Sequence, residues 1–136
     1  MRLWDYRLIP VLPKEMLVSQ WRECIAIKRQ WEKGTLKHRL VSYVMDYDKI
    51  KFKHYVNLIC GEMAKRNIKY QVKFHEEIDD FCGEDIWFEL YPEHNDRYLK
   101  QCYYNLQEKA DREIITKEEW QKIDEYYTKE VMGYGN

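Results

Sequence analysis

The stretch Ser19-Gln20-Trp21-Arg22-Glu23-Cys24 decides the fold of this chain, because it lies inside the first long helical pattern. When successive residues are rotated by about 100°, the apolar side chains gather in one arc, made of Leu17, Trp21, Cys24, Ile25, Ile27 and Trp31. Arg22 and Glu23 fall on opposite flanks of this arc. The pattern predicts an amphipathic helix from Pro13 to about Lys33, ended by Gly34, that buries Trp21 and keeps Glu23 out of the core.

Two segments next to this helix have their own signals. Residues 1–13 contain Pro10 and Pro13, which predict an extended apolar lead-in because the residue before a proline avoids the helical region. A second helix is expected from Asp48, its N-cap, to about Arg66, with Asn67 as its stop.

The second half of the chain gives a mixed pattern. Apolar and polar residues alternate from Ile68 to Phe74, which predicts a half-buried strand that could form one short hairpin with residues 40–45. Residues 75–93 are acidic and are expected to be irregular. Further helices are expected at 96–110 and after Thr116, whose spacing to Glu119 is that of a capping box. The sequence thus predicts a mainly α fold, a single compact domain over residues 1–136 with three to four helices and at most one short β-hairpin.

Charge divides the chain into two halves. Residues 1–75 carry 16 Lys and Arg against 7 Asp and Glu, whereas residues 76–136 carry 7 against 17. A basic half suits binding to a polyanion such as nucleic acid. The same asymmetry suits two halves that attract each other during folding, and charge alone does not separate these interpretations.

Several classes of protein find no support in the sequence. It has no Gly-rich phosphate loop, no His-Glu-x-x-His zinc helix and no Gly-x-Ser-x-Gly elbow. Its four cysteines are scattered and its four histidines lie far apart, so neither a disulfide scaffold nor a zinc knuckle is indicated. Because apolar runs are short and no signal-peptide core occurs, we expect a soluble cytoplasmic protein without a membrane segment.

A family resemblance begins at the first residues. Arg2, the helix that opens after Pro13, Leu17 and the Trp21-Arg22-Glu23 step together resemble the phage endonuclease V family of pyrimidine-dimer DNA glycosylases with AP-lyase activity. Similar segments follow in the same order, with the last two being looser: Val41-Ser42-Tyr43, Asp48-Lys49-Ile50, Ala64 to Lys69, Asn105 to Lys109, and the Tyr126-Tyr127 pair of an aromatic tail that runs to Asn136. The opening Met1-Arg2-Leu3-Trp4 and the step Tyr91 to His94 resemble a bacterial branch of the group.

The resemblance implies a mechanism and a set of site residues. The family's nucleophile is the α-amine of the mature N-terminus, which forms a Schiff base with the deoxyribose, and Glu23 matches the family's catalytic glutamate. Arg2 and Arg22 would hold phosphates beside the lesion. The implied partner is double-stranded damaged DNA, bound by a monomer, and no metal or cofactor is implied.

This sequence departs from the family pattern at two positions. The family's amine belongs to a small residue exposed by removal of the initiator methionine, but position 2 here is a large arginine, so we expect Met1 to be retained and its own amine to act. The family's arginine three residues beyond the glutamate is Ala26 here, and Arg29 is the candidate to replace it. Two alternatives stay open: a nucleic-acid-binding module that has lost the chemistry, and a protein-interaction domain whose acidic half is the working surface.

Overall fold

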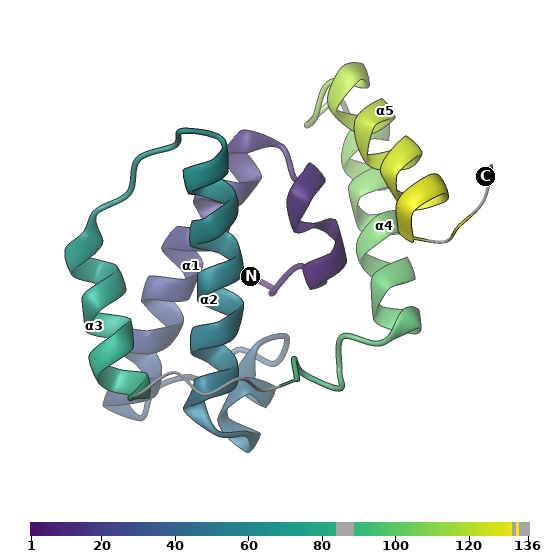
Figure 1. Ribbon diagram of the computed structural model, residues 1–136. Coiled ribbons are helices and arrows are strands. Elements are labelled where there is room, and N and C mark those ends of the chain that lie inside the picture. Colours follow the sequence, from purple (N-terminus) through teal and green to yellow (C-terminus); the bar gives the residue numbers. More distant parts are fainter. Residues whose placement is uncertain (84–88, 132, 134–136) are drawn as a thin grey trace. The chain divides into compact units, whose positions relative to one another are not determined.

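The computed structural model describes residues 1–83, 89–131 and 133, and the regular structure in these residues is helical (Figure 1). The α-helices are α1 (Lys14–Lys33), α2 (Lys49–Lys65), α3 (Val72–Cys82), α4 (Asp96–Asp111) and α5 (Lys117–Tyr126). The described residues also form two 3-10 helices, η1 (Tyr6–Val11) and η2 (Ser42–Asp46), and a π-helical turn, η3 (Tyr127–Val131). The mainly α fold expected from the sequence is confirmed.

Packing divides the chain into two units. The first unit contains Met1–Leu3 and Leu17–Tyr91, and the second contains Trp4–Met16 and Pro92–Asn136. The N-terminal segment therefore contributes its first three residues to one unit and the rest to the other. The single domain over residues 1–136 stays a prediction. No helix in the described part of the chain is both long enough and apolar enough to cross a membrane.

The core of the first unit is built mainly by α1 and α2. The apolar side chains that α1 and α2 bury there are Leu17, Trp21, Cys24, Ile27, Ile50, Phe52, Tyr55, Val56, Ile59, Cys60 and Met63. Each large apolar side chain of this kind stabilises the fold by roughly 1.5–3 kcal/mol relative to leaving it in water. The helix ends follow the sequence signals: Asp48 accepts a hydrogen bond from the backbone N–H of Ile50, and Gly34 adopts a φ of 74° just after α1.

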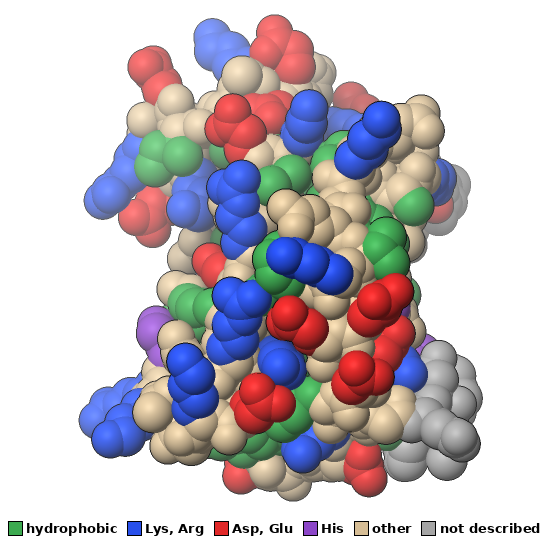
Figure 2. All heavy atoms as spheres, turned by 90° about the vertical axis from the view of Figure 1, so that its left-hand side faces the viewer, with side chains coloured by type: hydrophobic (Ala, Val, Ile, Leu, Met, Phe, Trp, Pro, Cys, Tyr) green, Lys and Arg blue, Asp and Glu red, His purple; other side chains and the backbone are tan. Residues whose placement is uncertain are grey.

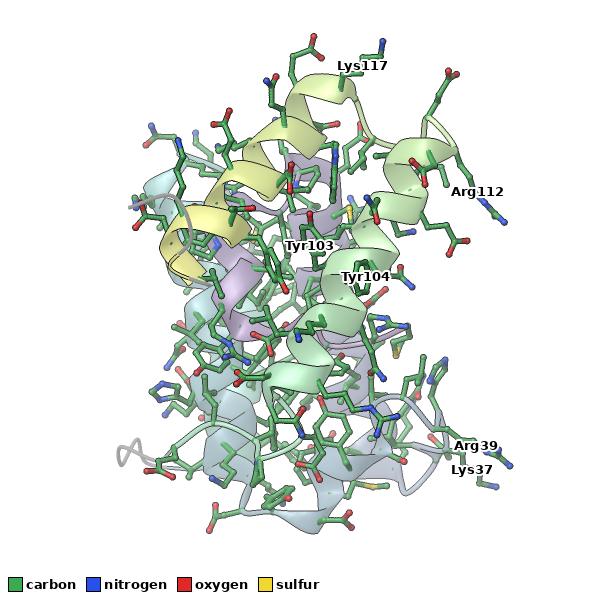
Figure 3. All side chains as sticks on the ribbon, turned by 90° about the vertical axis from the view of Figure 1, so that its right-hand side faces the viewer. Lys37, Arg39, Tyr103, Tyr104, Arg112 and Lys117 are labelled. Atoms are coloured by element: carbon green, nitrogen blue, oxygen red, sulfur yellow. The ribbon has the colours of Figure 1, made fainter. Side chains whose placement is uncertain are left out.

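The second unit packs η1 against α4 and α5. Its buried apolar side chains include Leu8, Ile9, Val11, Leu99, Cys102, Leu106 and Ile123. The expected capping box is present, because the Thr116 hydroxyl accepts from the Glu119 N–H at 3.0 Å and the Glu119 carboxylate accepts from the Thr116 N–H at 2.8 Å. On α4, the rings of Tyr103 and Tyr104 meet edge to face (Figure 3).

Helix α3 corrects two sequence predictions. The strand expected from Ile68 to Phe74 is wrong, since α3 begins at Val72, and residues 75–82, expected to be irregular, continue that helix. The four alternating apolar residues were misleading because Phe74 also starts a helical stripe, Phe74, Ile78 and Phe81, of which Ile78 is buried. The proposed partner, residues 40–45, contains the start of η2 instead of a strand. Residues 84–88 of the acidic segment, and 132 and 134–136 of the aromatic tail, lie outside the described residues.

The N-terminal lead-in is also different from its expected extended form. Tyr6–Val11 forms η1, with Pro10 inside it. Asp5 starts this turn by accepting the backbone N–H of Arg7 on its carboxylate and that of Leu8 on its carbonyl, both at 3.0 Å. Proline fits there because its fixed φ is compatible with a 3-10 turn.

Candidate active site

Helix α1 places Glu23 at the border between the core and solvent. Trp21 is 5% exposed and meets the ring of Tyr70 edge to face at 5.4 Å, which fixes the rotation of α1 about its axis. Glu23, two residues further on, is only partly buried. This agrees with the sequence prediction that Glu23 is not a core position.

Gln20 connects Glu23 to the start of the chain. Its amide nitrogen donates to the Glu23 carboxylate and to the main-chain carbonyl of Arg2, each at 2.9 Å. Its amide oxygen accepts a hydrogen bond of 2.8 Å from the hydroxyl of Tyr55 on α2. Gln20 and Tyr55 are buried, with exposures of 1% and 0%. The first residues of the chain are thus held against α1 beside the carboxylate.

The electrostatic surroundings of Glu23 include the N-terminal amine. Partial burial raises the pKa of the Glu23 carboxyl above its ordinary value, because desolvation disfavours the charged form. The positive charge of the amine at Met1 opposes this rise, followed by His38 and by the hydrogen bond from Gln20. The amine of residue 1 and the carboxyl of residue 23, distant in sequence, therefore act on each other electrostatically. We call Met1, the Arg2 carbonyl, Gln20 and Glu23 the Glu23 site.

The loop that carries His38 lies between two buried anchors. Leu36 and Val41 are 4% and 0% exposed, whereas residues 37–40 between them are exposed. The backbone carbonyl of His38 accepts from the N–H groups of Val41 and Ser42, and its ring nitrogen Nδ1 accepts from the N–H of Leu40. The neighbouring side chains Lys37 and Arg39 point outward (Figure 3). This loop brings His38 close enough to Glu23 to contribute to lowering the pKa of the Glu23 carboxyl.

The candidate phosphate-binding arginines differ in their surroundings. Arg22 is exposed on α1 and forms no ion pair within the described part of the chain. Arg29 lies 3.6 Å from the carboxylate of Glu77 and 5.1 Å over the ring of Phe74, so α3 already holds it. Arg2 is partly buried and its carbonyl is bound to Gln20. The face on which α3 lies mixes Asp and Glu side chains with Lys and Arg (Figure 2).

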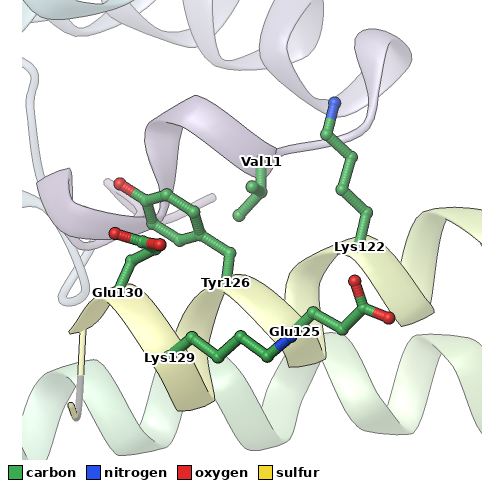
Figure 4. A pocket seen from close by; sticks show the side chains of 6 residues that line it. All are labelled: Val11, Lys122, Glu125, Tyr126, Lys129 and Glu130. Atoms are coloured by element: carbon green, nitrogen blue, oxygen red, sulfur yellow. The ribbon is translucent and has the colours of Figure 1, made fainter. Parts of the chain in front are cut away.

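Two surface hollows are lined by residues that do not belong to the Glu23 site. One, of about 250 Å³ in the second unit, is lined by Val11, Lys122, Glu125, Tyr126, Lys129 and Glu130 (Figure 4). Its two lysines and two glutamates balance in charge. The other, of about 400 Å³ in the first unit, is lined by Ala64, Asn67, Ile68, Lys69, Tyr70 and Val72. Within the described residues, no group of three or more His, Cys, Asp or Glu could hold a metal ion.

The fold and the site together define a class: a small helical protein that sets an α-amine near a glutamate and carries arginines on the same helix. A family model described as pyrimidine dimer DNA glycosylase matches residues 1–76, and the chain belongs to this family. Searches of the curated proteins and of the solved structures found no match.

The family match covers the whole Glu23 site. Residues 1–76 include Met1, Arg2, Arg22, Glu23 and Arg29, together with α1, η2, α2 and the first turn of α3. The membership expected from the Trp-Arg-Glu step is thereby confirmed. Sequence reasoning did not assign roles to Gln20, Tyr55 or His38. Gln20 was detectable in principle, because it precedes Glu23 by three residues and so lies one turn away on the same face of α1.

Proposed function

We propose that this protein is a DNA glycosylase with AP-lyase activity that acts on pyrimidine dimers or abasic sites in duplex DNA. Its nucleophile is the α-amine of Met1 and its catalytic carboxylate is Glu23. The observation that carries this proposal is the pair of hydrogen bonds from Gln20, each 2.9 Å, which hold the Arg2 carbonyl, one residue from the amine, beside the Glu23 carboxylate. Membership of the pyrimidine dimer DNA glycosylase family supports the same substrate.

The chemistry begins at the sugar. The lone pair of the amine attacks C1′ of the deoxyribose, and the electrons of the glycosidic bond leave with the base, which takes up a proton. Opening of the sugar ring at O4′ then gives a Schiff base between C1′ and the nitrogen. Loss of a C2′ proton expels the 3′ phosphate by β-elimination, and water later releases the enzyme. An α-amine suits this role because such groups ordinarily have a pKa near 8, well below that of lysine.

Glu23 supports the two charge-developing steps. As a carboxylate it stabilises positive charge on the sugar while the base departs, and it then moves protons during ring opening and elimination. Its raised pKa suits proton transfer, since a carboxyl that binds its proton more tightly than usual can also donate it nearer neutral pH. Its hydrogen bond from Gln20 keeps one oxygen directed inward.

Phosphate binding comes from the basic half of the chain. Arg22 and Arg2 hold phosphates beside the lesion, and Arg29 does so only when Glu77 releases it. Reaching C1′ in duplex DNA requires that the duplex be kinked and that a base be extruded from it. This deformation of the DNA costs a few kcal/mol, which the phosphate contacts offset.

Borohydride trapping tests the proposal. Reduction of the Schiff base converts it to a stable amine, so incubation of the protein with abasic-site duplex and borohydride should give a covalent protein–DNA adduct. Acetylation of the N-terminus removes the nucleophile, and a two-residue N-terminal extension displaces it; both should abolish the adduct without abolishing DNA binding. Intact-mass measurement should confirm that Met1 is retained.

Two other outcomes would replace the enzyme proposal. A folded protein that binds the duplex with the usual salt sensitivity but forms no adduct would be a nucleic-acid-binding module. A protein that binds DNA no better than a neutral control would be an interaction domain that uses its acidic half.

A further inference from the structure

The buried amide of Gln20 contacts both the N-terminal segment and the Glu23 carboxylate. One amide hydrogen points to the Arg2 carbonyl and the other to the Glu23 carboxylate, at 2.9 Å each. Arg2 follows Met1 directly, so the group that Gln20 holds is one residue from the reacting amine. A single side chain thereby links the segment that ends in the amine to the carboxylate that must act with it.

The hydroxyl of Tyr55 fixes which way this amide points. An amide has one donor end and one acceptor end, and the Tyr55 hydroxyl donates to the acceptor end at 2.8 Å. Rotation of the amide by 180° would direct its oxygen at two other acceptors, the Arg2 carbonyl and the Glu23 carboxylate, which is unfavourable. Since Tyr55 is fully buried on α2, its hydroxyl has little freedom to move away.

We infer that Gln20, oriented by Tyr55, is a positioning residue that sets the Met1 amine against the Glu23 carboxylate. This inference rests on the proposed function and names the part of the protein that aligns its two reacting groups. Alignment of this kind is valuable because small displacements of a nucleophile from its attack geometry slow a reaction strongly. The hydrogen bond also favours the ionised form of Glu23, so Gln20 influences the pH range in which the carboxylate is available.

Gln20→Met tests the inference, because methionine has nearly the shape of glutamine and cannot form these hydrogen bonds. With saturating abasic-site duplex, we expect the trapping rate to fall about 10- to 100-fold while the dissociation constant for the duplex changes less than twofold. The acid side of the pH–rate profile should move to higher pH, because Glu23 then stays protonated longer. Tyr55→Phe should also lower the trapping rate and move the acid side of the pH–rate profile to higher pH, each by less than Gln20→Met does.

A matched control separates positioning from general destabilisation. Gln30→Met makes the same exchange at a partly exposed position of α1 outside the Glu23 site, and should leave both rate and pH profile unchanged. If Gln20→Met is too unstable to assay, Tyr55→Phe and a direct NMR titration of the Glu23 carboxyl replace it. The carboxyl should then titrate at higher pH in Tyr55→Phe than in the wild type.

The outcomes distinguish this inference from the proposed function. Absence of an adduct with the wild-type protein overturns the proposed function and the inference with it. A wild-type adduct, together with Gln20→Met and Tyr55→Phe variants that react at the wild-type rate with an unchanged pH profile, overturns the inference alone. Loss of thermal stability without a change in rate or pH profile also overturns it, since that would be a purely structural role.

Discussion

Two carboxylates near the start of the chain, Asp5 in the second unit and Glu23 in the first, are held in opposite ways. Asp5 is fully buried and receives hydrogen bonds from the Arg7 guanidinium on both oxygens, at 3.0 and 3.1 Å. Glu23 is partly exposed and accepts a hydrogen bond from the uncharged side-chain amide of Gln20. A carboxylate bound on both oxygens by a guanidinium is fixed in position and suits a structural role. A carboxylate held by an amide, with an amine acting on it from a distance, can still exchange protons.

The titration behaviour of the two units follows the same division. The pKa of Glu23 is raised, mainly by burial, so its protonated form is favoured in the folded protein. Burial lowers the pKa of His94 in the second unit to about 4, with Arg7 adding to the decrease and Asp5 opposing it. The pKa of Arg7 itself is raised, chiefly by its hydrogen bond to Asp5, although burial opposes this. Acidification therefore stabilises the Glu23 site and destabilises the surroundings of His94.

Glu23→Gln should give the largest effect, a loss of about 10³-fold in the trapping rate, because general acid–base groups contribute roughly 10²- to 10⁴-fold. The free energy of unfolding at pH 7 should not fall. A carboxyl with a raised pKa stabilises the fold when protonated and loses that contribution as the pH rises through its pKa, and glutamine removes this loss.

The control for this variant is Glu15→Gln, which neutralises an exposed carboxylate in the first turn of the same helix. It should keep the wild-type trapping rate. Equal trapping rates for the wild type and Glu23→Gln would mean that Glu23, like Asp5, takes no part in the reaction.

Asp5→Asn should give the next largest effect, a decrease of about 3 kcal/mol in the free energy of unfolding, measured by urea denaturation. Removing the buried partner leaves the mostly buried Arg7 guanidinium with the exposed Asp96 as its counter-charge, and breaking a buried ion pair in this way is strongly destabilising. Asp96→Asn is the matched control, since Asp96 also binds Arg7 at 2.8 Å but its side chain is 86% exposed. Its effect should stay below about 1 kcal/mol, as for other exposed pairs. Similar losses in the two variants would contradict the structural role of Asp5.

The pH dependence of stability should depend on His94. Its folded pKa of about 4 lies below its ordinary value of 6.5, so the unfolded chain binds this proton first and stability falls as the pH decreases through that range. Between pH 7 and 4.5, the wild type should lose about 2 kcal/mol more than His94→Phe, which keeps an aromatic ring between Tyr6 and Tyr98. Parallel profiles for wild type and His94→Phe would rule out this source of acid sensitivity.

The smallest expected effect is a difference in DNA affinity between variants of two arginines of α1, Arg22 and Arg29. Arg22→Gln should weaken binding to abasic-site duplex about fivefold at 100 mM salt and lower the salt dependence by the equivalent of about one phosphate contact. Arg29→Gln should weaken it less than twofold, because Glu77 already compensates its charge. Glu77→Gln should strengthen binding in the presence of Arg29 but not in its absence. Equal losses for Arg22→Gln and Arg29→Gln would show that α3 does not hold Arg29 away from DNA.

Local signals in the sequence were sufficient for much of the fold. Helix α1 and its end at Gly34, the N-cap Asp48 and the capping box at Thr116 each depend on residues within one or two turns, and all are found as expected. Helix α3 was missed because its first apolar residues also alternate like those of a strand. Only the packing of Phe81 against Trp31, 50 residues earlier, makes the helical stripe visible.

The candidate site was predictable only in part, because some of its contacts join groups that lie far apart in the sequence. The resemblance at Trp21-Arg22-Glu23 named the carboxylate and the amine, and the family match covers both. The hydrogen bond from Tyr55 to Gln20 joins residues 35 positions apart in sequence, and the Arg2 carbonyl is a backbone atom without a sequence signal. Such partners become apparent only when α1, α2 and the N-terminal segment are packed together.

The central claim is that the amine of Met1 is the nucleophile, and peptide mapping of the trapped adduct tests it most directly. The protein is reduced with borohydride on abasic-site duplex, digested, and the residue that carries the sugar is identified by mass spectrometry. We predict that the sugar is attached to the N-terminal nitrogen of a peptide that begins with Met1. Attachment to the side chain of a lysine, such as Lys28 or Lys37, would contradict this account.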